Sequence, residues 1–421
     1  MRSSFIVLAA LLFALTPALA QTCPATCRLP TCYCASNAAP GGLTRAETPQ
    51  FVLVTFDDAI QARLEDQALK PVFAGVTNPG GRPAHRTYFA QAFNTDPAVA
   101  KAVVEAGHEI ANHTHTHTTG IATDGAEWRR QLDGLERFFR DTVGVDASQI
   151  VGFRAPYLAT NDAMWEELRR RGVLYESSLA ELADGPFSAG IGRFVWPHTL
   201  DFGAQTACVA AKCPSAPLPG VWSVPMWVLY NEEGRKVGEM DPQQTPVYTA
   251  DSTALYTMLR YNFDAHYTGN RAPLALYLHA GRVRRNDHAI AAFRRFLREV
   301  ANQPDVWLVT MKGLVYWMQH PVPASQMAAW FDGGGERGAL AATASEATER
   351  PTTPGTLRLW PNPSSSGQVH TSAHAPVEVY DLTGRRVAEA MPMGDMLDLS
   401  AVAPGAYLVR SGTERTLWVR R

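Results

Sequence analysis

The feature that most constrains the fold is the run FVLVTF at residues 51–56, which is followed directly by Asp57 and Asp58. A continuous apolar and β-branched run predicts a strand buried on both faces, as in parallel sheets. Side chains alternate along a strand, so adjacent carboxylates can serve one ligand only if the strand ends there. The carboxyl ends of parallel strands are where α/β folds place their chemistry. The alternative is a polar turn in which one of the two acids caps the next helix.

Further strand patterns alternate with helical patterns for some 270 residues after this run. Short apolar runs predict strands near residues 86–89, 151–153, 174–175, 274–279 and 306–310. Helical spacing is found near residues 61–69, 96–106, 127–142, 163–172, 251–269 and 288–302. Alternation of this kind predicts a parallel sheet, either an α/β barrel or a doubly wound sheet.

Composition shifts divide the chain into five segments. Residues 1–20 have an arginine, a short apolar core and the ending Ala-Leu-Ala, which together are typical of a secretory signal peptide. A cysteine-rich lead-in follows at 21–45, and the main domain is expected at 46–330, with long loops at 180–250. Residues 331–356 are rich in Gly, Ala, Thr and Pro and predict a linker. Residues 357–421 alternate apolar and polar residues in short runs, which predicts a small antiparallel β-sandwich.

Charge and cysteine content restrict the partners and the compartment. The formal net charge of -2 gives no indication of a nucleic-acid partner. After the signal peptide no segment is long and apolar enough for a transmembrane helix, so we expect export as a secreted or cell-surface protein, and a monomer. Export permits disulfides among the six cysteines, whereas four of them also have metal-ligand spacing. Cys208 and Cys213 could pair with each other, and the pairing within the lead-in stays open for Cys23, Cys27, Cys32 and Cys34.

A histidine-rich segment, HTHTH at residues 113–117, supplies candidate metal ligands. On a helical turn His113 and His117 would share a face, which is a common metal-ligand geometry. On a strand His115 would join them, and in a solvated loop none would bind a metal. Two histidines with one carboxylate of Asp57–Asp58 would leave positions open for water, as a catalytic zinc requires. The second carboxylate could then act as a general base.

Two more polar residues follow predicted strands. His279 ends the run LALYLH and could be a general acid, although a buried core histidine would give the same pattern. Arg154 follows another short strand, where a surface ion pair of little energetic value is the alternative.

Four motifs together resemble the polysaccharide deacetylases, the NodB-homology group or carbohydrate esterase family 4. They are TFDD at 55–58, HTHTH at 113–117, RAPY at 154–157 and LYLH at 276–279, in the family's order over about residues 50–320. The lead-in CRLPTCYC at 27–34 and the segment WPHTLD at 196–201 resemble invertebrate-type chitin deacetylases more closely.

This resemblance implies a distorted parallel (β/α) barrel of the polysaccharide deacetylase type and a role for each matching residue. Asp57 would be the base, and Asp58, His113 and His117 would hold a divalent metal. Zinc is expected for such a ligand set, with cobalt or nickel also possible. Arg154 would orient Asp57, His279 would protonate the leaving amine, and Asp201 looks like the acidic partner of that histidine. The backbone N–H of Tyr157, which follows Pro156, would help stabilise the oxyanion. Glu176 stands where relatives often carry Asp.

The implied reaction is metal-assisted hydrolysis of an acetamide. A metal-bound water would attack the N-acetyl carbonyl, with an Asp as base and a His as acid. The substrate would be a polymer of N-acetylglucosamine similar to chitin, with Trp222, Trp227 and Tyr157 stacking on sugar rings or, equally well, with the tryptophans in the core. The alternatives are a deacetylase of peptidoglycan or exopolysaccharide and a non-catalytic polysaccharide-binding protein.

The C-terminal segment resembles a type IX secretion sorting domain. The matching motifs are LWPNPS at 359–364, VYDLTGRRV at 379–387, LDLS at 397–400 and APGAYLVR at 403–410. The resemblance implies a contact with outer-membrane secretion machinery and removal of the tail. A carbohydrate-binding sandwich is the alternative.

Overall fold

The computed structural model describes residues 23–185, 188–206, 208 and 212–338, and in the C-terminal part 359–360, 368–371, 376–381, 385–391, 396–411 and 414–420. The predicted signal peptide and most of the predicted linker lie outside these residues. The chain divides into two compact units between residues 344 and 345, within the predicted linker. The described part of the first unit continues past residue 330 through helix α11 (Met327–Asp332) and a turn at Gly335–Arg337.

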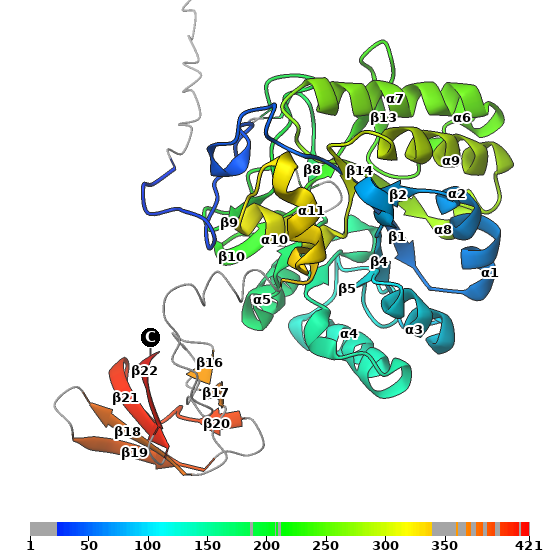
Figure 1. Ribbon diagram of the computed structural model, residues 1–421. Helices are drawn as coiled ribbons and strands as arrows, with labels where there is room; N and C mark the ends of the chain where they lie inside the picture. Colours follow the sequence, from blue (N-terminus) through cyan, green and yellow to red (C-terminus); the bar gives the residue numbers. More distant parts are fainter. Residues whose placement is uncertain are drawn as a thin grey trace, which may run out of the picture. The chain divides into compact units, whose positions relative to one another are not determined.

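The first unit is built on one large, mostly parallel sheet (Figure 1). Its strands in spatial order are β14 (Leu274–His279), β1 (Gln50–Asp58), β4 (Thr87–Ala90), β5 (Glu109–Asn112), β6 (Gly152–Phe153), β7 (Tyr175–Glu176), β10 (Leu218–Ser223) and β9 (His198–Leu200). Strand β15 (Val306–Leu308) pairs with the beginning of β1, and only β9 runs antiparallel to its neighbour. The predicted distorted barrel is confirmed as an α/β half-barrel, whose sheet does not close by strand pairing among the described residues.

Short strand pairs lie within residues 180–250, where long loops were expected. Strand β8 (Ala180–Glu181) pairs with β11 (Met226–Trp227), and the N–H of Trp227 donates to the hydroxyl of Tyr277 on β14 (3.3 Å). Two further pairs are β12 (Leu229–Tyr230) with β13 (Lys236–Gly238) and β2 (Thr77–Asn78) with β3 (Arg82–Pro83).

Helices surround the strands in Figure 1. They are α1 (Ala62–Leu64), which continues through a π-helical turn at Glu65–Leu69 into α2 (Lys70–Phe73), then α3 (Pro97–Glu105), α4 (Gly125–Phe138), α5 (Asp162–Arg171), α6 (Pro246–Ala250), α7 (Ser252–Thr268), α8 (Ala280–Val283), α9 (Asp287–Ala301) and α10 (Met311–Gln319). The pleat of β1 sends Val52, Val54 and Phe56 into the core beneath the helices and Phe51 and Leu53 into the barrel interior. Burial on both faces explains the continuous apolar run. None of the described helices is long and apolar enough to cross a membrane.

The lead-in covers the end of the sheet and carries two of the three disulfides. Cys23 pairs with Cys34, Cys27 with Cys32 and, further along the chain, Cys208 with Cys213. Tyr33 lies beside the edge strand β9, where its carbonyl accepts from the N–H of Thr199 (2.8 Å) and its own N–H donates to the Thr199 hydroxyl (3.1 Å).

The second unit contains two antiparallel sheets. Strands β16 (Leu359–Trp360), β17 (Gln368–Thr371) and β20 (Met396–Asp398) form one sheet, and β18 (Val377–Asp381), β19 (Arg386–Ala390), β21 (Gly405–Ser411) and β22 (Glu414–Arg420) form the other. Apolar side chains from both sheets share one core, among them Val369 and Leu397 from the first and Val379 and Trp418 from the second. This arrangement agrees with the predicted small β-sandwich.

Candidate active site

The two adjacent carboxylates reach one cleft because β1 ends at the second of them, Asp58. Asp57 is still in register with His279 on β14 and Phe89 on β4. Asp58 has a φ of 84°, a backbone conformation that non-glycine residues rarely adopt, and the extended conformation stops there. The alternation of the strand is thereby interrupted, and both side chains line the same cavity.

Arg154 fixes the position of Asp57. Its guanidinium is fully buried and donates to Asp57 Oδ1 (2.6 Å) and to the Thr55 hydroxyl (3.1 Å). The same group donates to the carbonyl of Ser177 (2.8 Å) and lies 3.7 Å from the centre of the Phe89 ring. Burial by itself would raise the pKa of Asp57, but Arg154, His113 and His279 outweigh it, and the pKa is lowered. Asp57 is therefore an ionised, buried carboxylate in a fixed orientation.

Asp58, His113 and His117 form a cluster with metal-ligand geometry. One ligand atom of each residue lies within 4.8 Å of the others, and His117 Nε2 is 3.2 Å from Asp58 Oδ1. The histidines do not share a helical turn, because they follow β5 in a loop where Thr114 and His117 have positive φ values of 72° and 58°. His115 is outside the cluster, since its side chain packs against Gly134 of α4.

A hydrogen bond sets the tautomer of His113. Its Nδ1 lies 2.8 Å from the carbonyl oxygen of Arg154, which can only accept, so Nδ1 carries the proton. Burial lowers the pKa of His113 to about 4, so the ring is neutral and Nε2 keeps its lone pair for a metal. Two imidazoles and a carboxylate fit a divalent ion with open coordination positions. The cluster is a divalent metal site of the kind expected from the sequence.

His279 is held by a carboxylate that the sequence did not indicate. Asp241 Oδ2 lies 2.6 Å from His279 Nδ1, and Asp241 Oδ1 accepts from the backbone N–H of His279 (2.9 Å). His279 Nε2 is thereby left toward the cleft, 3.9 Å from Asp58 Oδ2. Burial would lower the pKa of His279, but Asp241, Asp57 and Asp58 raise it above its ordinary value.

The prediction that Asp201 pairs with His279 is wrong. Asp201 lies just after β9, where its Oδ2 accepts from the backbone N–H of Gly220 (3.1 Å), and it does not line the cleft. Asp241 directly precedes a short 3-10 helix at Pro242–Gln244, in a segment that was expected to be a long loop. Its φ of 50° and its place beside β14 depend on tertiary contacts, which is why sequence patterns missed it.

Glu176 does not line the cleft either. It is fully buried at the end of β7, where it accepts from the Ser223 hydroxyl (2.6 Å) and the Ser178 N–H (2.7 Å). Burial raises its pKa to about 7.

Trp222 cannot stack on a sugar, so this prediction is wrong as well. Its side chain is fully buried inside the barrel, with its ring stacked 6.4 Å from that of Tyr33. Trp227 is equally buried, and the core alternative applies to both. The aromatic side chains exposed in the cleft are Tyr157 (64% exposed) and Phe93 (59%), of which Phe93 was missed.

Tyr157 lies beside the metal cluster. Its ring is edge-on to that of His117, with 4.6 Å between the centres, and its backbone has a φ of 57°. Pro156 before it is buried and begins the turn that presents this residue.

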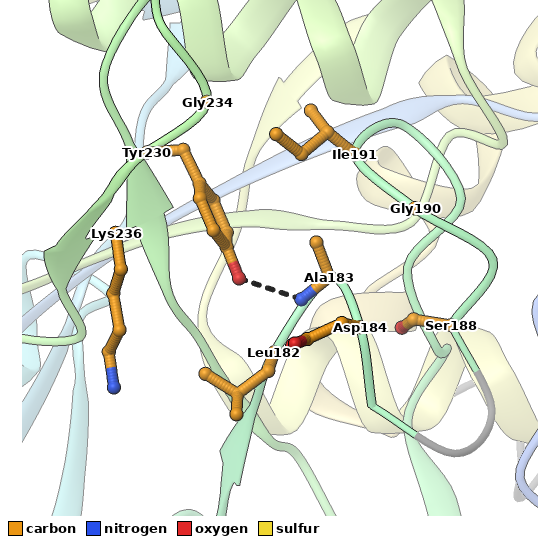
Figure 2. A pocket seen from close by; sticks show the side chains of 9 residues that line it. All are labelled: Leu182, Ala183, Asp184, Ser188, Gly190, Ile191, Tyr230, Gly234 and Lys236. Carbon is orange, nitrogen blue, oxygen red and sulfur yellow. Dashed lines mark hydrogen bonds between the residues drawn. The ribbon is translucent and has the colours of Figure 1, made fainter.

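These residues line a cleft of about 710 Å³. It brings together Asp57, Asp58, His113, His117, Tyr157 and His279 with Phe93, Met240, Arg63, Arg282 and Arg285, among others. Arg154, Asp241, Asp201 and Trp222 do not line it. A second cavity of about 480 Å³ is lined mainly by apolar atoms of the loop around Leu182 and Ile191 and of Tyr230, whose hydroxyl accepts from the Ala183 N–H (2.8 Å; Figure 2). That cavity contains none of the predicted site residues.

Comparison with known proteins finds similarity to the same family that the sequence motifs resemble. The family described as polysaccharide deacetylase matches residues 44–175. Chitin deacetylase 8 of Bombyx mori is 29% identical over 302 residues, covering 70% of this chain and 77% of the relative. Chitin deacetylase 1 of the same species is 29% identical over 318 residues, and the match covers 70% of this chain and 56% of the relative.

Solved structures of low identity were also found. The peptidoglycan deacetylase PdaC of Bacillus subtilis aligns with a TM-score of 0.36 at 12% identity, over 69% of this chain and 98% of that one. A family 4 acetyl xylan esterase from Clostridium thermocellum, in complex with a cobalt ion, aligns with a TM-score of 0.38 at 15% identity, over 66% and 95% of the two chains.

Proposed function

Because residues 44–175 match the polysaccharide deacetylase family, we propose that this protein removes N-acetyl groups from polymers of N-acetylglucosamine. The observation that carries the proposal is that one cleft contains a candidate general base, a metal site and a candidate general acid. Arg154 orients Asp57, which lies beside the metal site of Asp58, His113 and His117. Asp241 orients His279, which faces the same cleft.

A divalent ion bound by Asp58, His113 and His117 would supply Lewis-acid chemistry, because it polarises a carbonyl oxygen and lowers the pKa of a water molecule. We propose zinc, and the two-imidazole, one-carboxylate set also suits cobalt or nickel.

Asp57 acts as the general base in this proposal. Its lowered pKa keeps it ionised at neutral pH, and burial leaves few waters to compete for its free oxygen. It accepts a proton from the water that attacks the acetyl carbon. Arg154 is a positioning residue, because it holds Asp57 without lining the cleft.

His279 acts as the general acid. Its Nε2 faces the cleft while Asp241 binds Nδ1–H, and its raised pKa favours the protonated ring. It donates a proton to the amide nitrogen as the C–N bond breaks, which gives acetate and a free amine. An acid and a base thus hold opposite protonation states in one site. The backbone N–H of Tyr157 would stabilise the developing oxyanion.

The substrate is proposed to be a chitin-like polymer. Similarity to two silkworm chitin deacetylases supports this choice, at 29% identity. Exposed Phe93 and Tyr157 offer apolar surfaces for sugar rings at the mouth of the cleft. Peptidoglycan and exopolysaccharides carry the same acetamide and are the alternative substrates. A non-catalytic binding protein is disfavoured because every expected catalytic position is filled.

Export and sorting belong to the same proposal. The signal-peptide pattern of residues 1–20 and three disulfides support secretion or display at the cell surface. The sorting-domain motifs and the sandwich core of the second unit support a role of the tail in secretion. Mass spectrometry of the protein from the medium, the cell surface and the cell interior would test export and sorting. A chain that stays inside the cell with residues 1–20 intact would contradict export, and an exported chain that keeps residues 357–421 would contradict the sorting role.

The decisive experiment is acetate release from chitin oligomers and from peptidoglycan, with and without chelator. We expect release that the chelator abolishes and added zinc restores. Absence of metal-dependent release from every N-acetylated glycan would overturn the enzymatic proposal, and release from peptidoglycan alone would overturn the proposed substrate.

A further inference from the structure

One carboxylate oxygen of Asp241 contacts two side chains. Asp241 Oδ2 lies 2.6 Å from His279 Nδ1 and 3.4 Å from Arg282 Nε. His279 ends β14, and Arg282 follows it in α8. Asp241 is buried, whereas the Arg282 side chain is 47% exposed and lines the cleft. Arg282 therefore belongs both to the lining of the cleft and to the contacts of the carboxylate that orients the general acid.

The remaining contacts of Asp241 fix its backbone and its other oxygen. Its N–H donates to the Tyr277 carbonyl (2.9 Å), and Oδ1 accepts from the Gln243 amide (3.1 Å) and from the backbone N–H of His279 (2.9 Å). Among the residues that the structure describes, Oδ2 forms a hydrogen bond or ion pair only with His279 and Arg282. Arg282 is thus the one side chain besides the histidine itself that restrains this oxygen.

Arg282 also holds the turn that begins at Asp241. Its guanidinium donates to the side-chain carbonyl of Gln244, and the backbone N–H of Gln244 donates to the Asp241 carbonyl (2.9 Å). Asp241 needs support of this kind, because its φ of 50° is a conformation that non-glycine residues rarely adopt. One guanidinium therefore joins both ends of the turn to α8.

The energetic value of this contact lies in orientation rather than in stability. Because half of the Arg282 side chain is in solvent, its attraction to Asp241 is screened and should contribute little to the free energy of unfolding. The rate of a proton transfer depends far more steeply on geometry, since a misplacement of about 1 Å can lower it roughly 100-fold. A small change in the position of Asp241 would therefore affect catalysis before it affected folding.

Resting on the proposed function, we infer that Arg282 is a positioning residue for the general acid. It holds the Asp241 carboxylate against the His279 ring and ties the turn that begins at Asp241 to α8. The ring thereby keeps Nε2 directed at the cleft, where the amide nitrogen of the substrate is protonated. Because Arg282 acts through Asp241 and not on the sugar, its loss lowers kcat and leaves KM almost unchanged.

The test is a double-mutant cycle on the full protein loaded with zinc, with a chitin oligomer as substrate. Arg282→Gln should lower kcat roughly tenfold and change KM by less than about twofold. Arg282→Lys should restore part of the rate, because one ammonium group cannot replace the several fixed donors of a guanidinium. In the Asp241→Asn background, the same Arg282→Gln change should lower kcat by less than about twofold, since the residue through which it acts is already altered.

The matched control is Arg169→Gln on α5. The Arg169 side chain is also 47% exposed and pairs with a carboxylate, that of Glu166, but it does not line the cleft. This variant should keep the wild-type kcat. Equal losses from Arg282→Gln in both backgrounds, or a raised KM with unchanged kcat, would overturn the inference in favour of a direct contact between Arg282 and the sugar. A loss of rate that follows a lowered midpoint of thermal unfolding would also overturn it.

A measurement without turnover separates this inference from the proposed function. The Nδ1 proton of His279, bonded to a carboxylate, should give a downfield proton NMR signal, which Asp241→Asn identifies by its loss. We expect Arg282→Gln to shift or broaden that signal in the absence of substrate, and Arg169→Gln to leave it unchanged. A perturbed signal in a protein that releases no acetate from any glycan would contradict the proposed function and leave the positioning of His279 by Arg282 standing. Acetate release with an unperturbed signal in Arg282→Gln would do the reverse.

Discussion

Asp241 binds His279 through two hydrogen bonds, one to the ring Nδ1 (2.6 Å) and one to the backbone N–H (2.9 Å). The first raises the pKa of the ring and the second fixes the carboxylate itself. Since the general acid must be protonated before it reacts, the carboxylate influences the pH range of activity.

Replacement of Asp241 by Asn should shift the alkaline limb of the kcat/KM profile to lower pH. Without the negative charge the pKa of His279 falls, so the protonated ring is lost at a lower pH, and the maximal rate should fall roughly tenfold or more. Asp201→Asn is the matched control and should give the wild-type profile. A shift with Asp201→Asn and none with Asp241→Asn would contradict the assignment.

Substitutions of the two adjacent carboxylates should both lower activity but differ in their effect on metal content. Asp57→Asn removes the base but no metal ligand, so turnover should fall by roughly 10²-fold or more with metal content unchanged. Asp58→Asn should lose metal as well as activity. Acetate release and elemental analysis of the dialysed proteins distinguish the two, and loss of metal from Asp57→Asn would show that both residues are ligands.

Metal removal should lower stability along with activity. An ion that binds only the folded state adds stability that grows with its concentration over its dissociation constant, about 2.7 kcal/mol at a hundredfold excess. Thermal unfolding with chelator should therefore have a lower midpoint than with zinc. The His117→Ala variant, which lacks one ligand, should show little difference between the two conditions.

Buried and exposed aromatic residues should respond differently to truncation of the side chain. Trp222→Ala leaves a large cavity inside the barrel and should cost about 3–5 kcal/mol of unfolding free energy. Phe93→Ala removes an exposed ring and should raise KM with little change in stability. Urea unfolding and steady-state kinetics measure the two effects, and a stable Trp222→Ala protein with raised KM would restore the sugar-stacking role.

Acid should destabilise the first unit through buried neutral histidines. Burial lowers the pKa of His266 to about 4, and its Nδ1 lies 2.8 Å from the Ala272 carbonyl. The unfolded chain binds the proton near pH 6.5, so this stability is complete above that pH and is lost as the pH falls toward 4, up to about 3 kcal/mol. The slope of unfolding free energy against pH should be shallower for His266→Gln. The exposed His288→Gln is the control and should match the wild type.

Local sequence patterns predicted the parts of the site that end regular strands. Asp57, Asp58 and His279 follow apolar runs that are buried on both faces, and such runs are visible without any tertiary information. The alternation of strands and helices left a barrel and a doubly wound sheet open, and the resemblance of the four motifs to the deacetylase family favoured the distorted barrel.

Other features depend on contacts between distant segments. Asp241 reaches His279 from a loop 38 residues earlier, and no local sequence pattern marks Asp241 as the partner of that histidine. An aromatic residue such as Trp222 can equally well lie inside the barrel or at its mouth, and the local sequence does not distinguish these two locations. Cysteine spacing left the pairing of Cys23 with Cys34 open for the same reason.

The lead-in has a consequence for solubility. β9 is the last strand of the large sheet, and Tyr33 satisfies the backbone N–H of Thr199 on it. An uncovered edge strand is a template on which another chain can add a strand. Because two disulfides constrain the segment that carries Tyr33, a reducing environment would loosen this cover and favour aggregation before the barrel itself unfolds.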